Sequence, residues 1–139
     1  MIRQLSVFVE NQPGSIMRVT SELADAKINI RAIASYDTPE FGILRMVVDK
    51  PQEAKEHLTS RGFVVRIQEV TGAELKDEKG SLNKMLQALA DKGISISYIY
   101  SFVIRDRKEP VMVFNTDDKE KAEQALLESG VRLVGEEEL

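Results

Sequence analysis

The chain has 139 residues, of which 42% are hydrophobic and 30% charged, and a formal net charge of −4. This balance is typical of a soluble globular protein, and the negative charge argues against a general nucleic-acid binder. With no cysteine, disulfides and Cys-ligated metal sites are excluded. No basic segment with a long apolar run opens the chain, and no apolar run approaches the roughly 20 residues that span a bilayer. We therefore expect a cytoplasmic protein whose partners include neither nucleic acid nor a membrane.

The sequence repeats itself at an offset of 66 residues, which relates Gly14-Ser15 to Gly80-Ser81. The same offset relates Leu23-Ala24-Asp25 to Leu89-Ala90-Asp91, Ile28 and Ile30 to Ile94 and Ile96, and Met46-Val47 to Met112-Val113. Equal spacing across three successive elements indicates an internal duplication. We predict two domains, at residues 1–68 and 69–139.

The first repeat opens with a strand and a helix. Leu5, Val7 and Val9 alternate with other residues, which predicts a half-buried strand. A Pro-Gly turn then precedes a helix whose apolar residues recur at helical spacing and are expected to face the core. These residues are Ile16, Val19, Leu23 and Ala26.

A hairpin, a second helix and a closing strand complete the repeat. Strands are expected at about 28–36 and 41–49, a helix at about 51–61 beginning at Pro51, and a strand at about 63–70. In the second repeat the apolar stripe of the first helix is Leu82, Met85, Leu86 and Leu89. Strands are then expected at 94–104 and 110–116, with the charged stretch 105–109 as the hairpin loop between them. A helix at 118–129 and a strand at 131–134 are expected to follow.

This element order is that of the ferredoxin-like βαββαβ unit, an antiparallel sheet with both helices on one face. The fold class is α+β, with two such domains side by side. No Gly/Ser/Pro-rich linker separates the repeats, so we expect the domains to sit close together and their sheets to join.

The segment after the first strand is the most informative one. Pro13-Gly14 suits a type II turn, in which Gly supplies the positive φ. The unpaired N–H groups of the following helix start favour an anion such as a carboxylate. Asn11 contributes to that site or only caps the turn. Asn29, between two isoleucines, is either a ligand contact or a solvated amide at the strand end.

These residues carry a family resemblance. Asn-x-Pro-Gly after a strand, with Asn29 eighteen residues beyond Asn11, resembles the ACT domain of amino-acid regulatory proteins. The segments 40–45, 99–103 and 131–133 are similar to stand-alone tandem ACT proteins of bacteria. The resemblance covers essentially the whole chain.

The resemblance implies a non-catalytic regulatory module that binds a free amino acid where two domains meet. The loop after the first strand of one domain would then face the second strand of the other. Carried over to this sequence, the resemblance implies two such sites. In one, Ser95 would face the first loop, which comprises Asn11, Gln12, Pro13, Gly14, Ser15 and Ile16. In the other, Asn29 would face the second loop, with Lys76, Asp77, Gly80 and Ser81. Val9 stands where some relatives carry a ligand-contacting His. The second loop lacks the Pro and Ser95 replaces an Asn, so the two sites are expected to be unequal.

No pattern predicts catalysis, and we expect no catalytic residue, no metal and no cofactor. His57 is the only imidazole and is expected on a helix, either half-buried or at the surface. The acidic residues near 117–123 and 136–138 lack His or Cys companions. Arg45 is a second candidate for a carboxylate, or its stem packs on the sheet. Tyr98 and Tyr100 either shape a ligand pocket or pack between domains.

Three functions compete. The preferred one is an allosteric amino-acid-binding module, expected to be a homodimer and to act on a partner enzyme of amino-acid metabolism. The alternative is a protein-interaction regulatory subunit of such an enzyme, with a vestigial ligand site. An enzyme on a ferredoxin-like frame comes third, because a fold alone does not settle function.

Overall fold

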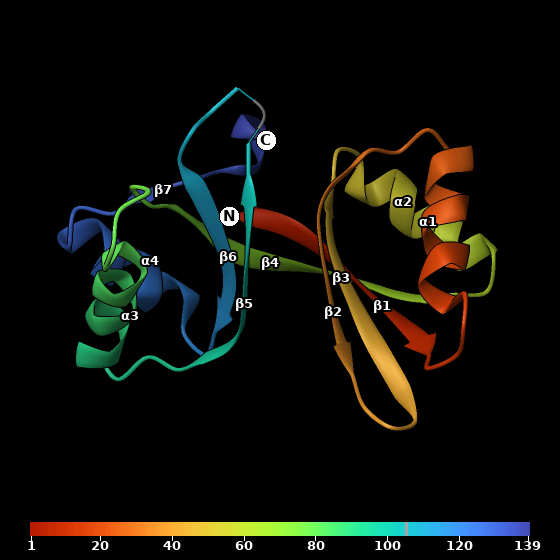
Figure 1. Cartoon of the computed structure of the whole chain (residues 1–139), viewed down its shortest axis with the longest axis horizontal. Coiled ribbons are helices and arrows are strands. Elements are labelled where there is room, and N and C mark those ends of the chain that lie inside the picture. The colour runs from red at the N-terminus through yellow and green to blue at the C-terminus, as the bar shows by residue number, and fades with distance from the viewer. Residues whose placement is uncertain (105) are drawn as a thin grey trace. The chain divides into compact units, whose positions relative to one another are not determined.

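The computed structural model describes residues 1–104 and 106–139 (Figure 1). Residue 105, the first of the expected charged hairpin loop, lies outside the described residues. In chain order the elements are β1 (Ile2–Glu10), α1 (Ser15–Asp25), β2 (Ile30–Asp37), β3 (Phe41–Val48), α2 (Pro51–Ser60), β4 (Val64–Glu74), α3 (Ser81–Asp91), β5 (Ile96–Val103), β6 (Pro110–Thr116), α4 (Lys119–Glu128), β7 (Arg132–Leu133) and the short 3-10 helix η1 (Glu136–Glu138).

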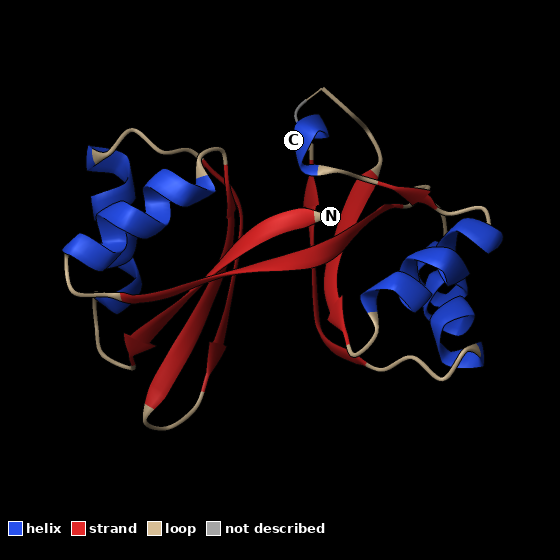
Figure 2. Cartoon of the chain, turned by 180° about the vertical axis from the view of Figure 1, so that it is seen from behind, coloured by secondary structure: helices blue, strands red, loops and turns tan. Residues whose placement is uncertain are grey.

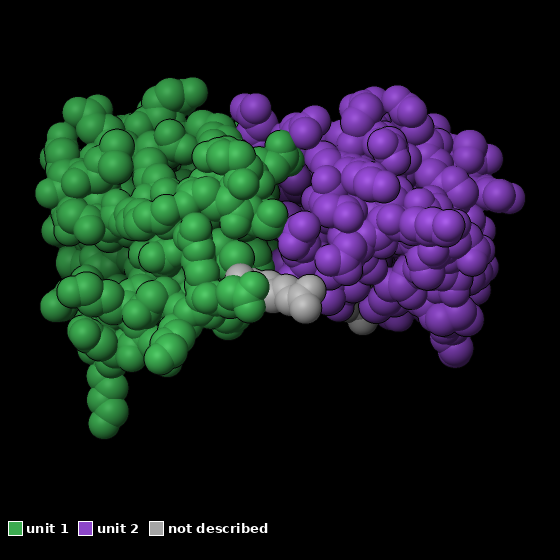
Figure 3. Space-filling model, turned by 90° about the horizontal axis from the view of Figure 1, so that it is seen from above, with its two compact units in different colours: residues 1–2, 70–139 green, residues 3–69 purple. Residues whose placement is uncertain are grey.

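The chain folds into two compact units (Figure 3). Unit 2 is Arg3–Glu69, and unit 1 combines Met1–Ile2 with Val70–Leu139. Strand β4 crosses this boundary, so one long strand closes the first repeat and opens the second. The domain limits 1–68 and 69–139, which concern the repeats, stay a prediction.

Unit 2 has the strand order β2-β3-β1-β4. Strand β3 pairs antiparallel with β1, with Leu5 opposite Met46, and with β2, with Ile33 opposite Met46. Helices α1 and α2 both lie on one face of this sheet (Figure 2). This is the predicted ferredoxin-like βαββαβ arrangement.

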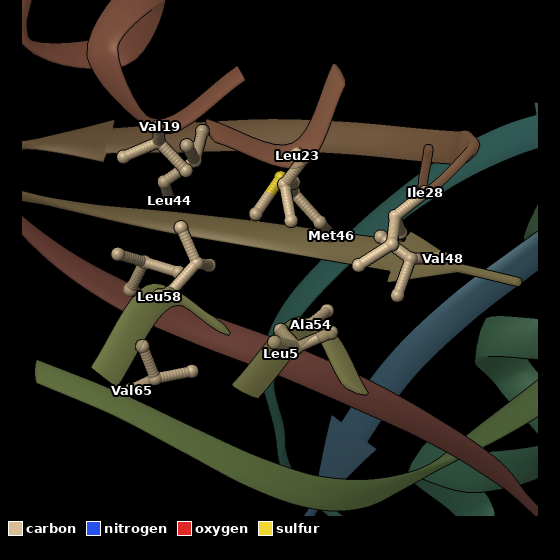
Figure 4. Packing of buried hydrophobic residues seen from close by; sticks show 11 residues of the cluster. Leu5, Val19, Leu23, Ile28, Leu44, Met46, Val48, Ala54, Leu58 and Val65 are labelled. Atoms are coloured by element: carbon tan, nitrogen blue, oxygen red, sulfur yellow. The ribbon is translucent and has the colours of Figure 1, made fainter. Parts of the chain in front are cut away.

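The core of unit 2 lies between these helices and the sheet (Figure 4). Helix α1 contributes Val19 and Leu23, and α2 contributes Ala54 and Leu58, all fully buried. The strands contribute Leu5, Val7, Leu44, Met46, Val48 and Val65. Each buried Val or Leu side chain stabilises the fold by about 1.5–3 kcal/mol, so the amphipathic pattern of α1 accounts for its position.

Two expectations about side-chain faces are wrong. Ile16, which the helical periodicity places on the core stripe, is 42% exposed, and Leu82, predicted on the equivalent stripe of the second repeat, is 41% exposed. On β1, Gln4 and Ser6 are buried although their face was expected to meet solvent. The hydroxyl of Ser6 accepts from Gln4 Nε2 at 3.4 Å and donates to Gln68 Oε1 at 3.5 Å. These polar groups can therefore be buried, because they satisfy one another.

Unit 1 repeats the design. The second half of β4 pairs antiparallel with β6 and with β7, and β5 pairs with β6. Helices α3 and α4 share one face of this sheet (Figure 1). The core between these helices and the sheet includes Met85, Leu89, Phe114, Ala122 and Leu126. Both repeats thus form the same unit from different apolar residues.

Candidate functional site

The loop between β1 and α1 is a type II turn, as predicted. The N–H of Ser15 donates to the carbonyl of Gln12 at 3.1 Å, which closes the turn. Pro13 and Gly14 are its central residues, and Gly14 has φ 82° and ψ 0°. Only glycine adopts this left-handed conformation without a steric penalty. The turn therefore delivers the chain directly into the first residue of α1.

The loop between β4 and α3 has the same geometry without the proline. The N–H of Ser81 donates to the carbonyl of Glu78 at 3.3 Å, and Gly80 has φ 86° and ψ −4°. Lys79 takes the position of Pro13. The backbone of the candidate site is thus conserved between the two repeats although its side chains differ.

Both turns lead into helix starts that no side chain caps. Gly14 and Gly80 are the N-cap residues of α1 and α3, and neither helix has an acidic residue in its first turn. Helix α4 differs, because Asp118 Oδ1 accepts from the N–H of Lys121 at 3.0 Å and Glu120 lies in its first turn. The second N–H groups of α1 and α3, on Ile16 and Leu82, have no carbonyl within their helices. These starts retain the positive end of the helix dipole with neither a capping side chain nor a first-turn carboxylate.

An apolar side chain is exposed beside each open helix start. Ile16 is 42% exposed and Leu82 is 41% exposed. They are equivalent in the duplication, so the exposure is a property of the fold at this position. Ser15, in contrast, is buried.

A pocket of about 150 Å³ lies beside the first loop. Its lining residues come from the end of β1, the loop, the start of α1 and the two strands of the hairpin. They are Val9, Glu10, Asn11, Gln12, Ser15, Ile16, Ser35, Tyr36, Gly42 and Ile43. Of the residues predicted from the sequence, this pocket brings together Asn11, Gln12, Ser15 and Ile16.

Asn11 connects the loop to the hairpin. Its Nδ2 donates to the carbonyl of Thr38 at 3.5 Å, in the turn between β2 and β3. In unit 1 the equivalent Asp77 donates its backbone N–H to Glu109 Oε2 at 2.5 Å. The equivalent loop residues Asn11 and Asp77 therefore contact the hairpin region of their own units, through different groups.

Sequence reasoning missed the strand residues of the pocket, Ser35, Tyr36, Gly42 and Ile43. They border the loop because Val9 pairs with Gly42 across β1 and β3 and Asp37 pairs with Gly42 across β2 and β3. The Gly42 in the hairpin was a usable signal, because a strand glycine often marks a close approach. A Cβ there would lie 3.3 Å from both Val9 Cγ2 and the carbonyl oxygen of Tyr36.

A larger hollow adjoins each of the two open helix starts, in addition to the pocket beside the first loop. In unit 2 it measures about 310 Å³ and includes Ser15, Arg18 and Gly62. In unit 1 it measures about 270 Å³ and includes the equivalent Ser81, Lys84 and Gly130, together with the predicted Lys76. Arg18 Nη2 donates to Ser15 Oγ at 3.3 Å.

Asn29 and Ser95 lie exposed just before β2 and β5. Their backbones are fixed in the same way: the N–H of Asn29 donates to Asp49 Oδ1 at 3.0 Å, and that of Ser95 to Asp117 Oδ1 at 3.2 Å. Asn29 precedes the first residue of β2 and Tyr36 lies near the other end of that strand. The two residues are therefore roughly 20 Å apart, at about 3.3 Å per residue. Within unit 2, Asn29 is therefore not brought to the loop of Asn11.

The remaining candidates lie on the strands. Arg45 is half-buried and is opposite Ser6 on β1, on the sheet face away from the helix-covered core. Its Nε is fully buried, so a large part of its stem is packed on the sheet. Tyr98 and Tyr100 are half-buried along β5.

Residues 1–139 match the family described as ACT domain pair. The chain belongs to this family. None of the curated proteins matches it. Among solved structures, protein BT0572 from Bacteroides thetaiotaomicron has 33% sequence identity and a TM-score of 0.90, with 99% of this chain and 94% of that chain covered.

The fold of this ACT domain pair is also that of aspartate kinase regulatory subunits. The subunit from Thermus thermophilus has 21% identity and a TM-score of 0.66 over 91% of both chains. The subunit from Thermus flavus has 20% identity and a TM-score of 0.63 over 92% of both chains. At these identities the likeness shows the fold alone.

His57, the only imidazole, bridges the two helices of the ACT unit 2. Its Nε2 lies 2.9 Å from Glu22 Oε2, which also lies 3.4 Å from Arg61 Nε. Within the described part of the ACT pair, no group of three or more His, Asp or Glu residues is arranged to hold a metal ion. In the same ranges, 1–104 and 106–139, no helix is long and apolar enough to cross a membrane.

Proposed function

We propose that this ACT domain pair is a non-catalytic regulatory module that binds a free amino acid. The observation that carries the proposal is the pair of duplicated helix starts, which lack both a capping side chain and a first-turn carboxylate. Such a start binds a carboxylate through its N–H groups and its dipole. The amide of Asn11 beside the first start offers a further donor and an acceptor for an ammonium group.

The proposed ligand lies where two ACT domains meet. The residues of the first loop, Asn11 to Ile16, would contact it together with Ser95, and Lys76, Asp77, Gly80 and Ser81 would do so together with Asn29. The fixed backbones and exposed side chains of Asn29 and Ser95 support such a role. Because Ser95 is shorter than Asn29 and Asp77 is charged where Asn11 is neutral, the two sites are unequal.

Binding would regulate by favouring one arrangement of the protein over another. A ligand shifts such an equilibrium only by its difference in affinity between the states. We propose that the protein is a cytoplasmic homodimer. It would convey this shift in equilibrium to a partner enzyme of amino-acid metabolism.

The alternative is an interaction subunit with a vestigial ligand site. The edge strand β5 favours it, because its eight residues carry no charge and Val103 is 61% exposed. Exposed, uncharged edge strands pair readily with other chains.

A thermal-shift panel of the twenty amino acids tests the proposal. Ligand at about 100 times its Kd raises the free energy of unfolding by about 2.7 kcal/mol, so at least one amino acid is expected to raise the Tm. Asn11→Ala should weaken that amino acid about tenfold, which is the value of a charge-assisted hydrogen bond. Gln52→Ala, on an exposed face of α2, is the matched control and should bind normally. A flat panel would contradict the proposal and support the interaction subunit.

A further inference from the structure

An apolar patch lies on the face of the unit 2 sheet that α1 and α2 leave open. Phe8 on β1 pairs with Ile43 on β3, and Ile43 pairs with Tyr36 on β2. Their neighbours Val7 and Leu44 belong to the core beneath the helices. Since successive side chains of a strand leave by opposite faces, Phe8, Ile43 and Tyr36 point away from the helices.

Two further residues enlarge this patch. Phe41 precedes Ile43 by two residues and so shares its face, and its ring centroid lies 6.5 Å from that of Phe8. Val64 precedes the core residue Val65 on β4 and also leaves by the open face. The open-face patch therefore crosses all four strands, at the end of the sheet where β2 turns into β3 (Figure 1). It comprises Phe8, Tyr36, Phe41, Ile43 and Val64.

Much of the open-face patch is exposed. The exposed fraction is 62% for Tyr36, 61% for Val64 and 44% for Phe41, while Phe8 and Ile43 are half-buried. Contiguous apolar surface of this kind marks an interaction site, whereas single exposed apolar residues are ordinary. The patch therefore calls for an occupant.

The equivalent end of the unit 1 sheet is charged and engaged by the chain itself. Glu74 and Arg132 stand 66 and 68 residues after Phe8 and Val64, and they are opposite each other on β4 and β7. Glu74 Oε2 lies 3.1 Å from Arg132 Nη1, and Arg132 Nη2 also donates to Glu138 of η1. The C-terminal turn thus engages this end of the sheet in unit 1, whereas the same end of unit 2 is apolar and exposed.

We infer that the open-face patch binds the same patch of a second copy of this chain, sheet face against sheet face. The inference rests on the proposed function, because it assigns a surface to the proposed homodimer. A two-fold contact requires a surface that is complementary to itself. The charges that flank the patch meet this requirement.

One charge of each sign lies on either side of the patch. Glu10 follows Phe8 by two residues on β1, and Arg66 follows Val64 by two residues on β4; both are exposed. By equivalence with β4 and β7, which pair antiparallel, β1 and β4 run in opposite directions. Glu10 and Arg66 therefore lie beyond opposite sides of the patch. A two-fold axis that runs along the patch, across the strands, brings Glu10 of one copy toward Arg66 of the other, twice.

The size of the patch predicts a weak dimer. An aromatic side chain buries about 150–250 Å², so the exposed parts of Tyr36 and Phe41 would supply roughly 200 Å² per copy. Stable complexes bury about 800 Å² per partner. We therefore expect an association that depends on protein concentration.

Sedimentation equilibrium of the full chain over a range of concentrations tests this inference. The parent should show a monomer–dimer equilibrium. Tyr36→Ser and Phe41→Ser should each weaken dimerisation at least about tenfold, because each removes an aromatic anchor. Val103→Ser is the matched control and should leave the Kd unchanged. It removes an apolar side chain that is 61% exposed, on the edge strand β5 of unit 1.

A charge exchange at exposed positions distinguishes a second copy from any other occupant, and keeps the test valid if an aromatic variant does not fold. Glu10→Arg and Arg66→Glu should each weaken the dimer, and the double variant should recover the parental Kd, because the opposite charges meet again across the two-fold axis.

A dimer that keeps its Kd in the folded patch variants would overturn the inference and leave the proposed homodimer standing. A double variant no tighter than the single ones would overturn the inference as well. A chain that is monomeric at every concentration would overturn both the inference and the proposed homodimer, and would leave the patch to a different protein. Amino-acid binding is tested separately by the thermal-shift panel.

Discussion

Ile2 fills the space in which a side chain on Gly72 would lie. A Cβ built on Gly72 would be 2.5 Å from Ile2 Cδ1 and 3.0 Å from the carbonyl oxygen of Val134. Ile2 is fully buried, so its side chain has no free volume to move into. The first residues of the chain thus lie against the strand that opens the second repeat, within unit 1.

Gly72→Ala should lower the free energy of unfolding by about 1–3 kcal/mol, the cost of overpacking a filled core. Urea denaturation measures this change. Ile2→Ala alone should cost about 2–5 kcal/mol through the cavity that it leaves. The double variant should lose less free energy of unfolding than the sum of the two single losses, because the new methyl group occupies part of that cavity. Strict additivity would mean that the two residues are not in contact.

The left-handed residues just beyond helices α1 and α3 offer a reciprocal test of backbone strain. Lys27 and Gly93 are equivalent in the duplication, and both have positive φ, at 59° and 69°. Their N–H groups make the same bond, to the carbonyls of Ala24 and Ala90. An L-residue pays about 1–2 kcal/mol for this conformation, whereas Gly does not. The second repeat therefore has the less strained helix end.

Lys27→Gly should raise the free energy of unfolding by about 0.5–1 kcal/mol after the entropy cost of glycine is subtracted. Gly93→Lys should lower it by a similar amount. Chemical denaturation of both variants checks the pair. Equal signs for the two changes would show that side-chain contacts, and not backbone strain, decide stability at these positions.

The sequence was sufficient for the repeat, the turn and the element order, because each depends on local pattern. It did not reveal the pocket wall formed by Ser35 and Gly42, since this wall depends on the pairing register of three strands. Helical periodicity placed Ile16 on the stripe of Val19 and Leu23 but could not indicate how far the sheet extends beneath the helix. For the same reason, the burial of Gln4 was missed: alternation describes one face of a strand, not what covers the other.

The C-terminal turn of unit 1 predicts a pH dependence of stability. The N–H of Gly135 donates to Glu138 Oε2 at 2.9 Å, Arg132 Nη2 donates to Glu138 Oε1, and Arg107 Nη1 donates to Oε1 at 3.4 Å. The backbone hydrogen bond from Gly135, followed by that from Arg132, holds the pKa of Glu138 below its ordinary value. The folded chain therefore releases this proton more readily than the unfolded chain.

A lowered pKa contributes stability above the ordinary glutamate pKa of about 4.3, and that stability is lost as the pH falls through the folded pKa. Glu138→Gln should therefore lower the Tm at pH 7, and the difference from the parent should close as the pH falls below the ordinary value and through the lowered pKa of Glu138. The effect should be small because the carboxylate is at the surface. Glu137→Gln is the control, since Glu137 pairs with none of these arginines in the described structure. A Tm difference that stays constant across the titration would contradict the role of the Glu138 charge.

The two loop turns predict that a proline can be transferred from one repeat to the other. Pro13 and Lys79 occupy the same position of equivalent turns, each closed by a hydrogen bond from the serine that follows the glycine. Among the described residues, the N–H of Lys79 donates no hydrogen bond that a proline would remove. A proline in a compatible turn stabilises by about 0.4–1 kcal/mol, because it restricts the unfolded chain. Lys79→Pro should therefore raise the free energy of unfolding by this amount, and Pro13→Lys should lower it similarly. Both are measured by urea denaturation, and a destabilised Lys79→Pro would show that the second turn does not share the backbone of the first.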